Sequence, residues 1–182
     1  MLIVPVAVNV SAVQFRQKGF RELIKQVLFE TGIAPEYIEL ELTESLLLSN
    51  ADVTFNVLRD LKDMGLKLVI DDFGTGYSSL SYLRQFPVTK LKIDRSFIQD
   101  IAFDPDAAAI TNAIISMSKS LNLKVIAEGV ENEAQLTILR EHNCDEYQGY
   151  YFSHPLSVQD VASKLRKPLM LKHEEKLATA VA

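Results

Sequence analysis

Two patterns of hydrophobic positions alternate along this sequence. In the first, apolar residues recur every three or four positions, which is typical of one face of a helix. This spacing predicts helices around residues 20–28, 53–64 and 110–121. The positions that carry it are Phe20, Leu23, Ile24, Val27 and Leu28; Val53, Val57, Leu61 and Met64; and Ile110, Ile114, Met117 and Leu121.

The second pattern is a short apolar run without helical spacing, of the length of a β-strand. Nearly continuous apolar character is typical of strands that are buried on both faces, as in parallel sheets. The predicted strands are Val4–Val10, Tyr37–Leu42, Leu66–Ile70, Lys90–Ile93, Lys124–Ala127 and Glu146–Phe152.

Glycine and asparagine residues mark where the predicted helices stop. Both residue types tolerate the left-handed backbone conformation that closes a helix, and each is followed by an apolar residue that can pack back on the helix. The predicted stops are Gly32, Gly65, Asn122 and Asn143. Helix starts are predicted at Asp104–Pro105, and at Asn132 and Ser157 with the capping-box partners Gln135 and Asp160.

Together the patterns describe a strand followed by a helix, repeated along the chain. Eight such units, in roughly 250 residues, close a TIM-like (β/α) barrel. We therefore predict an α/β fold of this type, incomplete, with about six of the eight units present. A doubly wound open sheet is the alternative that periodicity leaves open. The barrel domain is expected over residues 1–166, and a flexible tail over residues 167–182.

Composition narrows the function classes. The 182 residues are 48% hydrophobic, enough for a real core, and the net charge of -5 argues against binding to duplex nucleic acid. The single cysteine, Cys144, rules out an internal disulfide and is interpreted as a packing residue. The uncharged opening, Met1–Phe15, is too short to span a membrane, so we expect a cytoplasmic protein without membrane insertion.

Each predicted strand delivers polar residues near its carboxyl end, where β/α barrels place their active sites. Several carboxylates gathered there would repel one another unless cations lie among them, and a single lysine cannot neutralise the set. We therefore predict a metal site. The polar positions are Asn9; Glu41 and Glu44; Asp71 and Asp72; Lys92 and Asp94; Glu128 and Glu131; and Gln148.

The types of ligand atom indicate the class of metal. Carboxylate and amide oxygens suit Mg²⁺ or Mn²⁺ rather than zinc. Among the histidines, only His154 comes near a strand end, and it lies beyond the last strand. His142 and His173 are interpreted as structural or solvated residues.

The segment Asp71–Leu80 is the most distinctive local motif. Gly74 and Gly76 permit unusual backbone angles and a close approach to a ligand, and Ser78–Ser79 can open the next helix. A glycine loop beside a helix start is predicted to act as a phosphate cradle or as a moving lid.

These segments, taken in order, resemble the EAL domain family of cyclic-di-GMP phosphodiesterases. The resemblance covers about residues 4–165. It implies a modified TIM barrel, a pair of Mg²⁺ or Mn²⁺ ions, and hydrolysis of cyclic-di-GMP to linear pGpG. The matching segments are Asn9–Ser11, Glu41–Glu44, Asp71–Leu80, Lys92–Asp94, Glu128–Glu131 and Gln148–Tyr150.

By position, the resemblance implies a role for each matching residue. The implied metal ligands are Asn9, Glu41, Asp71, Asp72 and Glu128. The implied catalytic residues, which act on the attacking water or the developing charge, are Lys92, Glu131 and Glu128. The implied substrate-binding residues are Gln148, Asp94 and Ser11, and the implied lid residues are Glu44, as its anchor, with Phe73, Gly74 and Gly76.

One family feature has no counterpart in the match. The family carries a metal-binding glutamate in a Glu-Ala-Leu segment on its first strand; no such strand precedes Asn9, and Glu133–Ala134 lies at a helix start. The resemblance therefore implies a domain truncated at its amino end. An inactive module that binds cyclic-di-GMP or a protein partner is the alternative. A homodimer is also expected by analogy with the family.

Overall fold

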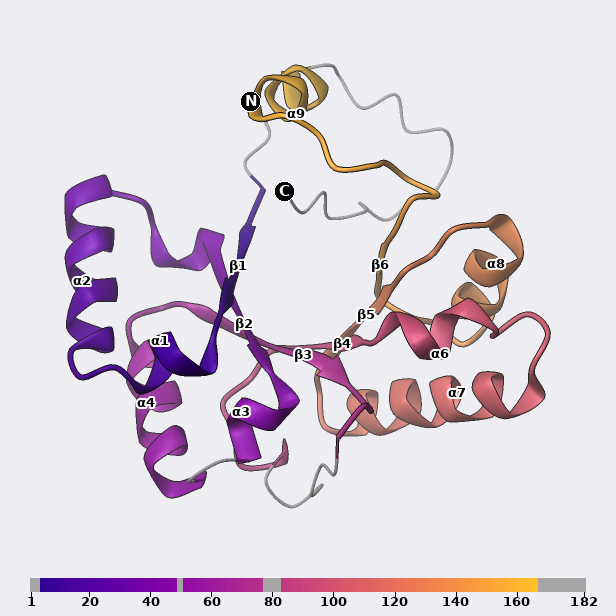
Figure 1. The fold of residues 1–182 in the computed structure, drawn as a ribbon, viewed down its shortest axis with the longest axis horizontal. Helices are drawn as coiled ribbons and strands as arrows, with labels where there is room; N and C mark the ends of the chain where they lie inside the picture. The colour runs from indigo at the N-terminus through magenta and orange to yellow at the C-terminus, as the bar shows by residue number, and fades with distance from the viewer. Residues whose placement is uncertain (1–3, 49–50, 77–82, 167–182) are drawn as a thin grey trace. The chain divides into compact units, whose positions relative to one another are not determined.

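The computed structural model describes residues 4–48, 51–76 and 83–166 (Figure 1). Among these residues, 5–92 form one compact unit, and 93–166 together with residue 4 form another. The expected tail, residues 167–182, and the Tyr77–Leu80 part of the glycine loop lie outside the described residues.

The unit of residues 5–92 alternates strands and helices, as the hydrophobic pattern predicts. Its strands are β1 (Val6–Val10), β2 (Ile38–Thr43), β3 (Lys67–Phe73) and β4 (Lys90–Ile93), the last of which ends at the boundary of the unit. Its helices are α1 (Ala12–Arg16), α2 (Phe20–Thr31), the short 3₁₀ helix η1 (Pro35–Tyr37), α3 (Glu44–Leu48) and α4 (Ala51–Asp63).

The sheet of this unit determines which side chains face the site. β1, β2 and β3 pair in parallel, and β4 follows β3 in the strand order. Successive side chains of a strand point to opposite faces, so Leu40 and Leu42 share one face of β2 while Glu39, Glu41 and Thr43 share the other. The two leucines are fully buried, as is Leu58 of α4. The apolar face is therefore packed, and the other face carries the carboxylates.

The second unit repeats the same plan with two strands. Its strands are β5 (Lys124–Glu128) and β6 (Glu146–Gln148), which pair in parallel with Glu128 opposite Gln148. Its helices are α6 (Arg95–Gln99), α7 (Pro105–Ser120), α8 (Glu133–Glu141) and α9 (Val158–Arg166). Helix α7 contacts both α6 and β5.

The predicted helix boundaries are confirmed by the backbone. Gly32, Asn122 and Asn143 have φ angles of 65°, 57° and 58°, in the left-handed region that ends a helix. Asn132 forms the predicted capping box with Gln135 at the start of α8. Asp104 caps α7, with proline in its first turn.

Several strand predictions need correction. β3 continues past Ile70 to Phe73, so Asp71 and Asp72 lie within the strand. β6 ends at Gln148 because the chain then turns, with the N–H of Phe152 donating to the carbonyl of Gly149. β1 is not buried on both faces: Val6 and Val8 are 51% and 43% exposed.

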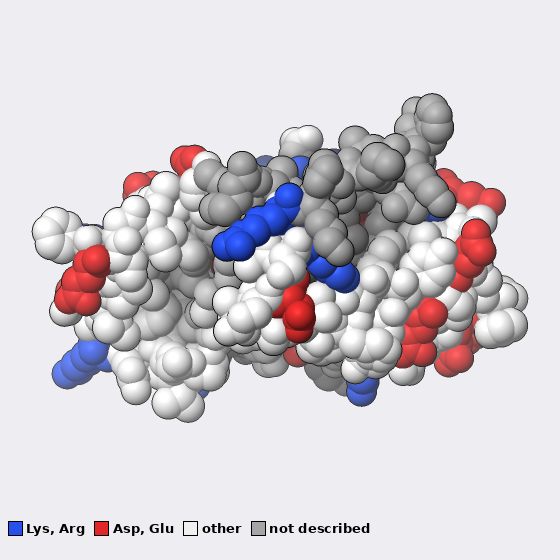
Figure 2. Space-filling view, turned by 90° about the horizontal axis from the view of Figure 1, so that it is seen from above, with Lys and Arg blue, Asp and Glu red and all other residues white. Residues whose placement is uncertain are grey.

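The charged surface and the lone cysteine complete the description. In the face drawn in Figure 2, both basic and acidic side chains lie among uncharged ones. Cys144 is buried between β5 and β6, with its thiol near the carbonyls of Val125 and Glu146, so the packing interpretation is confirmed. Within the described ranges, no helix has the length and apolar character needed to cross a membrane.

Candidate active site

Three charged side chains from neighbouring strands meet in the carboxyl-terminal part of the first unit's sheet. The Nζ atom of Lys92 lies 3.0 Å from Oε1 of Glu41 and 3.0 Å from Oδ1 of Asp71. All three residues are buried. The structure thus joins three of the predicted site residues into one carboxylate–lysine cluster.

The electrostatics of this cluster show an excess of negative charge. Two carboxylates share one ammonium group, and the half-buried Asp72 follows directly in the chain. Burial raises the pKa of Glu41, Lys92 opposes that rise, and the nearby charges of Asp71 and Glu39 add to it. A divalent cation beside these oxygens would offset both the burial and the repulsion.

Asn9 and Asp72 are backbone neighbours of cluster residues: Asn9 lies opposite Glu41 on the adjacent strand, and Asp72 follows Asp71 in the chain. The pairing of β1 with β2 sets Asn9 opposite Glu41, and the Asn9 side chain is exposed. Asp72 has a φ angle of 54°, which residues other than glycine adopt uncommonly. Its N–H donates to Oδ1 of Asp71 at 3.1 Å. Backbone strain of this kind concentrates at functional sites, and no local sequence pattern predicted it at Asp72.

The glycine loop begins against Glu44, the first residue of α3. The N–H of Gly74 donates to Oε2 of the buried Glu44 at 2.9 Å. A Cβ atom on residue 76 would lie only 2.8 Å from Oε1 of the same carboxylate. Gly76 therefore permits the loop to approach Glu44 closely, and Phe73, at the end of β3, is buried.

Sequence reasoning missed a second charged layer, formed by Glu39, Lys67 and Lys90. The Nζ atom of Lys90 lies 3.0 Å from Oε2 of Glu39, and the Nζ atom of Lys67 lies 3.8 Å from Oε1. This lower layer sits two residues before Glu41 and Lys92 on β2 and β4. Two charged residues at a spacing of two on a buried strand were the signal that could have revealed it.

The second unit brings Glu128 and Gln148 together. Their strands pair so that the two residues are opposite each other, and both side chains are half-buried. Glu131 is exposed, and its backbone N–H donates to Oε1 of Gln135 at 2.7 Å. Gln135 itself is buried, which the sequence did not predict for a polar helix residue.

Two predicted substrate-binding residues also cap helices. Oδ1 of Asp94 accepts from the backbone N–H and the hydroxyl of Ser96 at the start of α6. Ser11 forms a capping box with Gln14 at the start of α1. Their backbone positions are therefore fixed by local hydrogen bonds.

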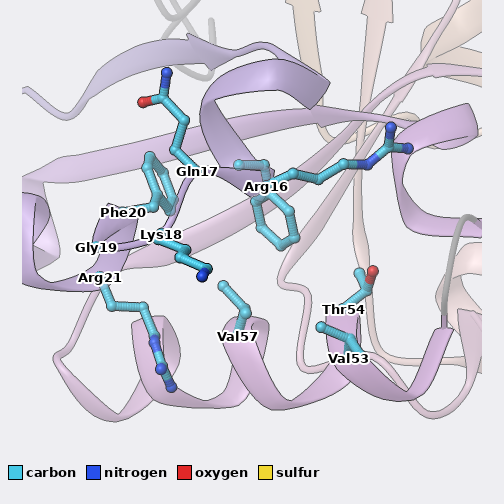
Figure 3. Close-up of a pocket in the computed structure, with 10 residues that line it drawn as sticks. Arg16, Gln17, Lys18, Gly19, Phe20, Arg21, Val53, Thr54 and Val57 are labelled. Carbon is cyan, nitrogen blue, oxygen red and sulfur yellow. The ribbon is translucent and has the colours of Figure 1, made fainter.

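A separate pocket of about 350 Å³ lies between the α1–α2 connection and α4 (Figure 3). Arg21 reaches across to α4 and pairs with Asp60. None of the predicted site residues lines this pocket. Its lining residues are Phe15, Arg16, Gln17, Lys18, Gly19, Phe20, Arg21, Val53, Thr54 and Val57.

Comparison with known proteins identifies the family. The EAL domain model matches residues 2–155. The chain belongs to the EAL domain family. It is 50% identical over 151 residues to the signaling protein YkoW of Bacillus subtilis, a match that covers 83% of this chain and 19% of YkoW. The chain spans about a fifth of the length of the curated relatives it matches.

Solved structures of other proteins are similar to this chain in fold and sequence. The PaMucR phosphodiesterase in complex with c-di-GMP is 43% identical, with a TM-score of 0.84 over 86% of this chain and 64% of that one. The manganese and cyclic-di-GMP complex of Klebsiella pneumoniae BlrP1 is 30% identical, with a TM-score of 0.76 over 82% of this chain and 38% of BlrP1. The predicted α/β, TIM-like barrel class of this EAL domain is thereby confirmed.

Proposed function

We propose that this EAL domain hydrolyses cyclic-di-GMP to linear pGpG with the help of divalent metal ions. The observation that carries the proposal is the buried cluster in which Lys92 contacts Glu41 and Asp71 at 3.0 Å each. Such a cluster is poorly explained by stability alone, since buried ion pairs contribute little to it. The similarity to a phosphodiesterase solved with c-di-GMP supports this substrate.

The donor atoms fit Mg²⁺ or Mn²⁺. The residues that would hold such ions, Asn9, Glu41, Asp71, Asp72 and Glu128, offer only oxygen ligands. In the first unit two of these carboxylates, Glu41 and Asp71, share the ammonium of Lys92, so negative charge remains in this pair of contacts for a cation to balance. Bound ions of this class supply hydroxide at neutral pH and stabilise the oxygens of an in-line displacement at phosphorus.

The chain's own groups have distinct tasks in this proposal. Lys92 donates to two carboxylates at once, which fixes their orientation and keeps a positive charge beside the reacting phosphate. Glu131, with Glu128, orients the attacking water, and Gln148, Ser11 and Asp94 contact the substrate. Glu44 holds Gly74 at the start of the lid, which limits access of bulk water.

Hydrolysis is tested directly with the purified chain. Cyclic-di-GMP is incubated with Mg²⁺, Mn²⁺ or Ca²⁺, and pGpG is quantified by chromatography. We expect Mg²⁺- or Mn²⁺-dependent product, and a loss of about 100-fold or more in kcat for Glu41→Gln. Glu36→Gln, an exposed glutamate of η1, is the matched control and should keep its activity.

The outcomes separate the proposal from its alternative. No product with any of these metals, for the chain with and without the residues encoded upstream of Met1, would overturn it. Binding of cyclic-di-GMP in calorimetry without product formation would instead indicate an inactive binding module. A cytoplasmic location and a homodimer complete the proposal; light scattering at the mass of a single chain would remove the homodimer.

A further inference from the structure

The loops that follow β5 and β6 are joined through their backbones. The N–H of Val130 donates to the carbonyl of Gln148 at 3.0 Å, and the N–H of Tyr151 donates to the carbonyl of Val130 at 3.0 Å. We call this pair of hydrogen bonds the clasp. It extends the parallel pairing of Glu128 with Gln148 beyond the ends of both strands, whose positions are labelled in Figure 1.

The clasp requires glycine at position 149. A Cβ atom on this residue would lie 2.1 Å from the carbonyl oxygen of Val130 and 2.4 Å from its nitrogen, whereas real Cβ contacts lie beyond 3.0 Å. Both atoms are backbone atoms that take part in the clasp. The Val130 side chain is fully buried, so the loop cannot give way without unpacking it. Any side chain at position 149 must therefore push the two loops apart by roughly 1 Å.

The clasped loop carries two candidate site residues. Glu128 precedes Val130 and Glu131 follows it, and the backbone of Glu131 is held on its other side by Gln135. The buried Gln135 amide in turn donates to the carbonyl of Gln99 at 3.1 Å. The Glu128–Glu131 loop is thus fixed between α6 and α8 on one side and Gly149 on the other.

We infer that Gly149 is a positioning residue, which sets Glu128 and Glu131 relative to Gln148 by permitting the clasp. This inference rests on the proposed function, in which Glu128 and Glu131 orient the attacking water and Gln148 contacts the substrate. A displacement of about 1 Å in such a site can lower the rate about 100-fold.

The first test needs no variant. Amide hydrogen exchange on the native chain should show that Val130 and Tyr151, although they lie outside regular strands, exchange at least about 100-fold more slowly than unstructured amides. Fast exchange of both amides in a folded chain would refute the clasp.

The second test compares Gly149→Ala with Gly32→Ala. Gly32 also has a positive φ angle, but a Cβ atom there would meet nothing within 4 Å. We expect Gly149→Ala to raise the Mn²⁺ dissociation constant, measured by calorimetry, about 10-fold and to lower kcat about 100-fold with a smaller change in KM. Gly32→Ala should lose some stability and leave these values unchanged.

The outcomes distinguish this inference from the proposed function. A folded Gly149→Ala chain with the Mn²⁺ affinity of Gly32→Ala would overturn the positioning role. If Gly149→Ala does not fold, the exchange rates of Val130 and Tyr151 in the native chain decide whether the clasp exists, and fast exchange overturns the inference. If the native chain hydrolyses nothing, the proposed function fails, while exchange and Mn²⁺ binding still report on Gly149.

Discussion

Replacing Lys92 by methionine removes the ammonium group of the carboxylate–lysine cluster while keeping most of the side-chain volume. The side chains of Lys92 and Glu41 are 4% and 3% exposed, so water cannot replace the lost partner. Removing one member of a buried ion pair typically lowers the free energy of unfolding by about 3 to 5 kcal/mol. Because two carboxylates lose their partner here, we expect a loss of about 3 kcal/mol or more without metal.

Urea unfolding and thermal melting measure this change. A loss of about 3 kcal/mol corresponds to roughly 6 to 12 °C in Tm for a chain of this size. Mn²⁺ present at about 100 times its dissociation constant should restore about 2.7 kcal/mol, since it binds the folded state and supplies the missing positive charge. Lys92→Met should also abolish hydrolysis, and Mn²⁺ should not restore it. The added metal does not replace the ammonium group that orients the two carboxylates and lies beside the reacting phosphate.

Lys62→Met is the matched control, since Lys62 is an exposed lysine of α4 in the same unit. It should change the free energy of unfolding by less than about 0.5 kcal/mol. The double variant Lys92→Met/Glu41→Gln should lose less stability than the sum of the single variants, by at least about 1 kcal/mol. Equal effects of Lys92→Met and Lys62→Met would refute the reasoning, because the buried contacts would then carry no energy.

Three further predictions concern the lid, the cysteine and a helix end. Gly76→Ala places a Cβ atom 2.8 Å from Oε1 of Glu44, so kcat should fall about 10-fold in the hydrolysis assay while Gly32→Ala has no such effect. Burial raises the pKa of the Cys144 thiol to about 12, so the unfolded thiol ionises first as pH rises above about 8.5. Urea unfolding should therefore lose about 2 kcal/mol more between pH 8 and pH 10 in the native chain than in Cys144→Ala. Asn122→Ala should lower Tm through a cost of about 1 kcal/mol for its left-handed backbone, whereas Asn122→Gly should keep or raise it.

The helix ends and the strand positions were predictable because they depend on local chemistry. Asn122 and Asn143 have the left-handed angles expected from their place after an apolar stripe. The order of polar residues at strand ends likewise follows from the chain alone. The sequence therefore predicted that Glu41, Asp71 and Lys92 would lie near the carboxyl ends of their strands.

The remaining features depend on register and neighbours, which local patterns do not specify. Lys67 contacts Glu39 because β2 and β3 pair with these residues opposite each other. Val6 and Leu23 are exposed although their apolar pattern predicted burial. In the described part of the chain β1 pairs with β2 alone, so one of its sides lacks the packing that the pattern requires.

The two charged layers on β2 and β4 bring buried charges of opposite sign together across the sheet. Neighbouring charges along each strand have the same sign and repel one another, but Glu39 and Glu41 on β2 pair with Lys90 and Lys92 on β4. Each glutamate is therefore paired across the strands, and the like-charge effect of Glu39 on Glu41 is opposed by Lys92. Buried pairs of this kind add little stability, but they fix the register between strands, because a slip by one residue would bury unpaired charges. The lower layer thus holds β2 and β4 in the alignment that the carboxylate–lysine cluster needs.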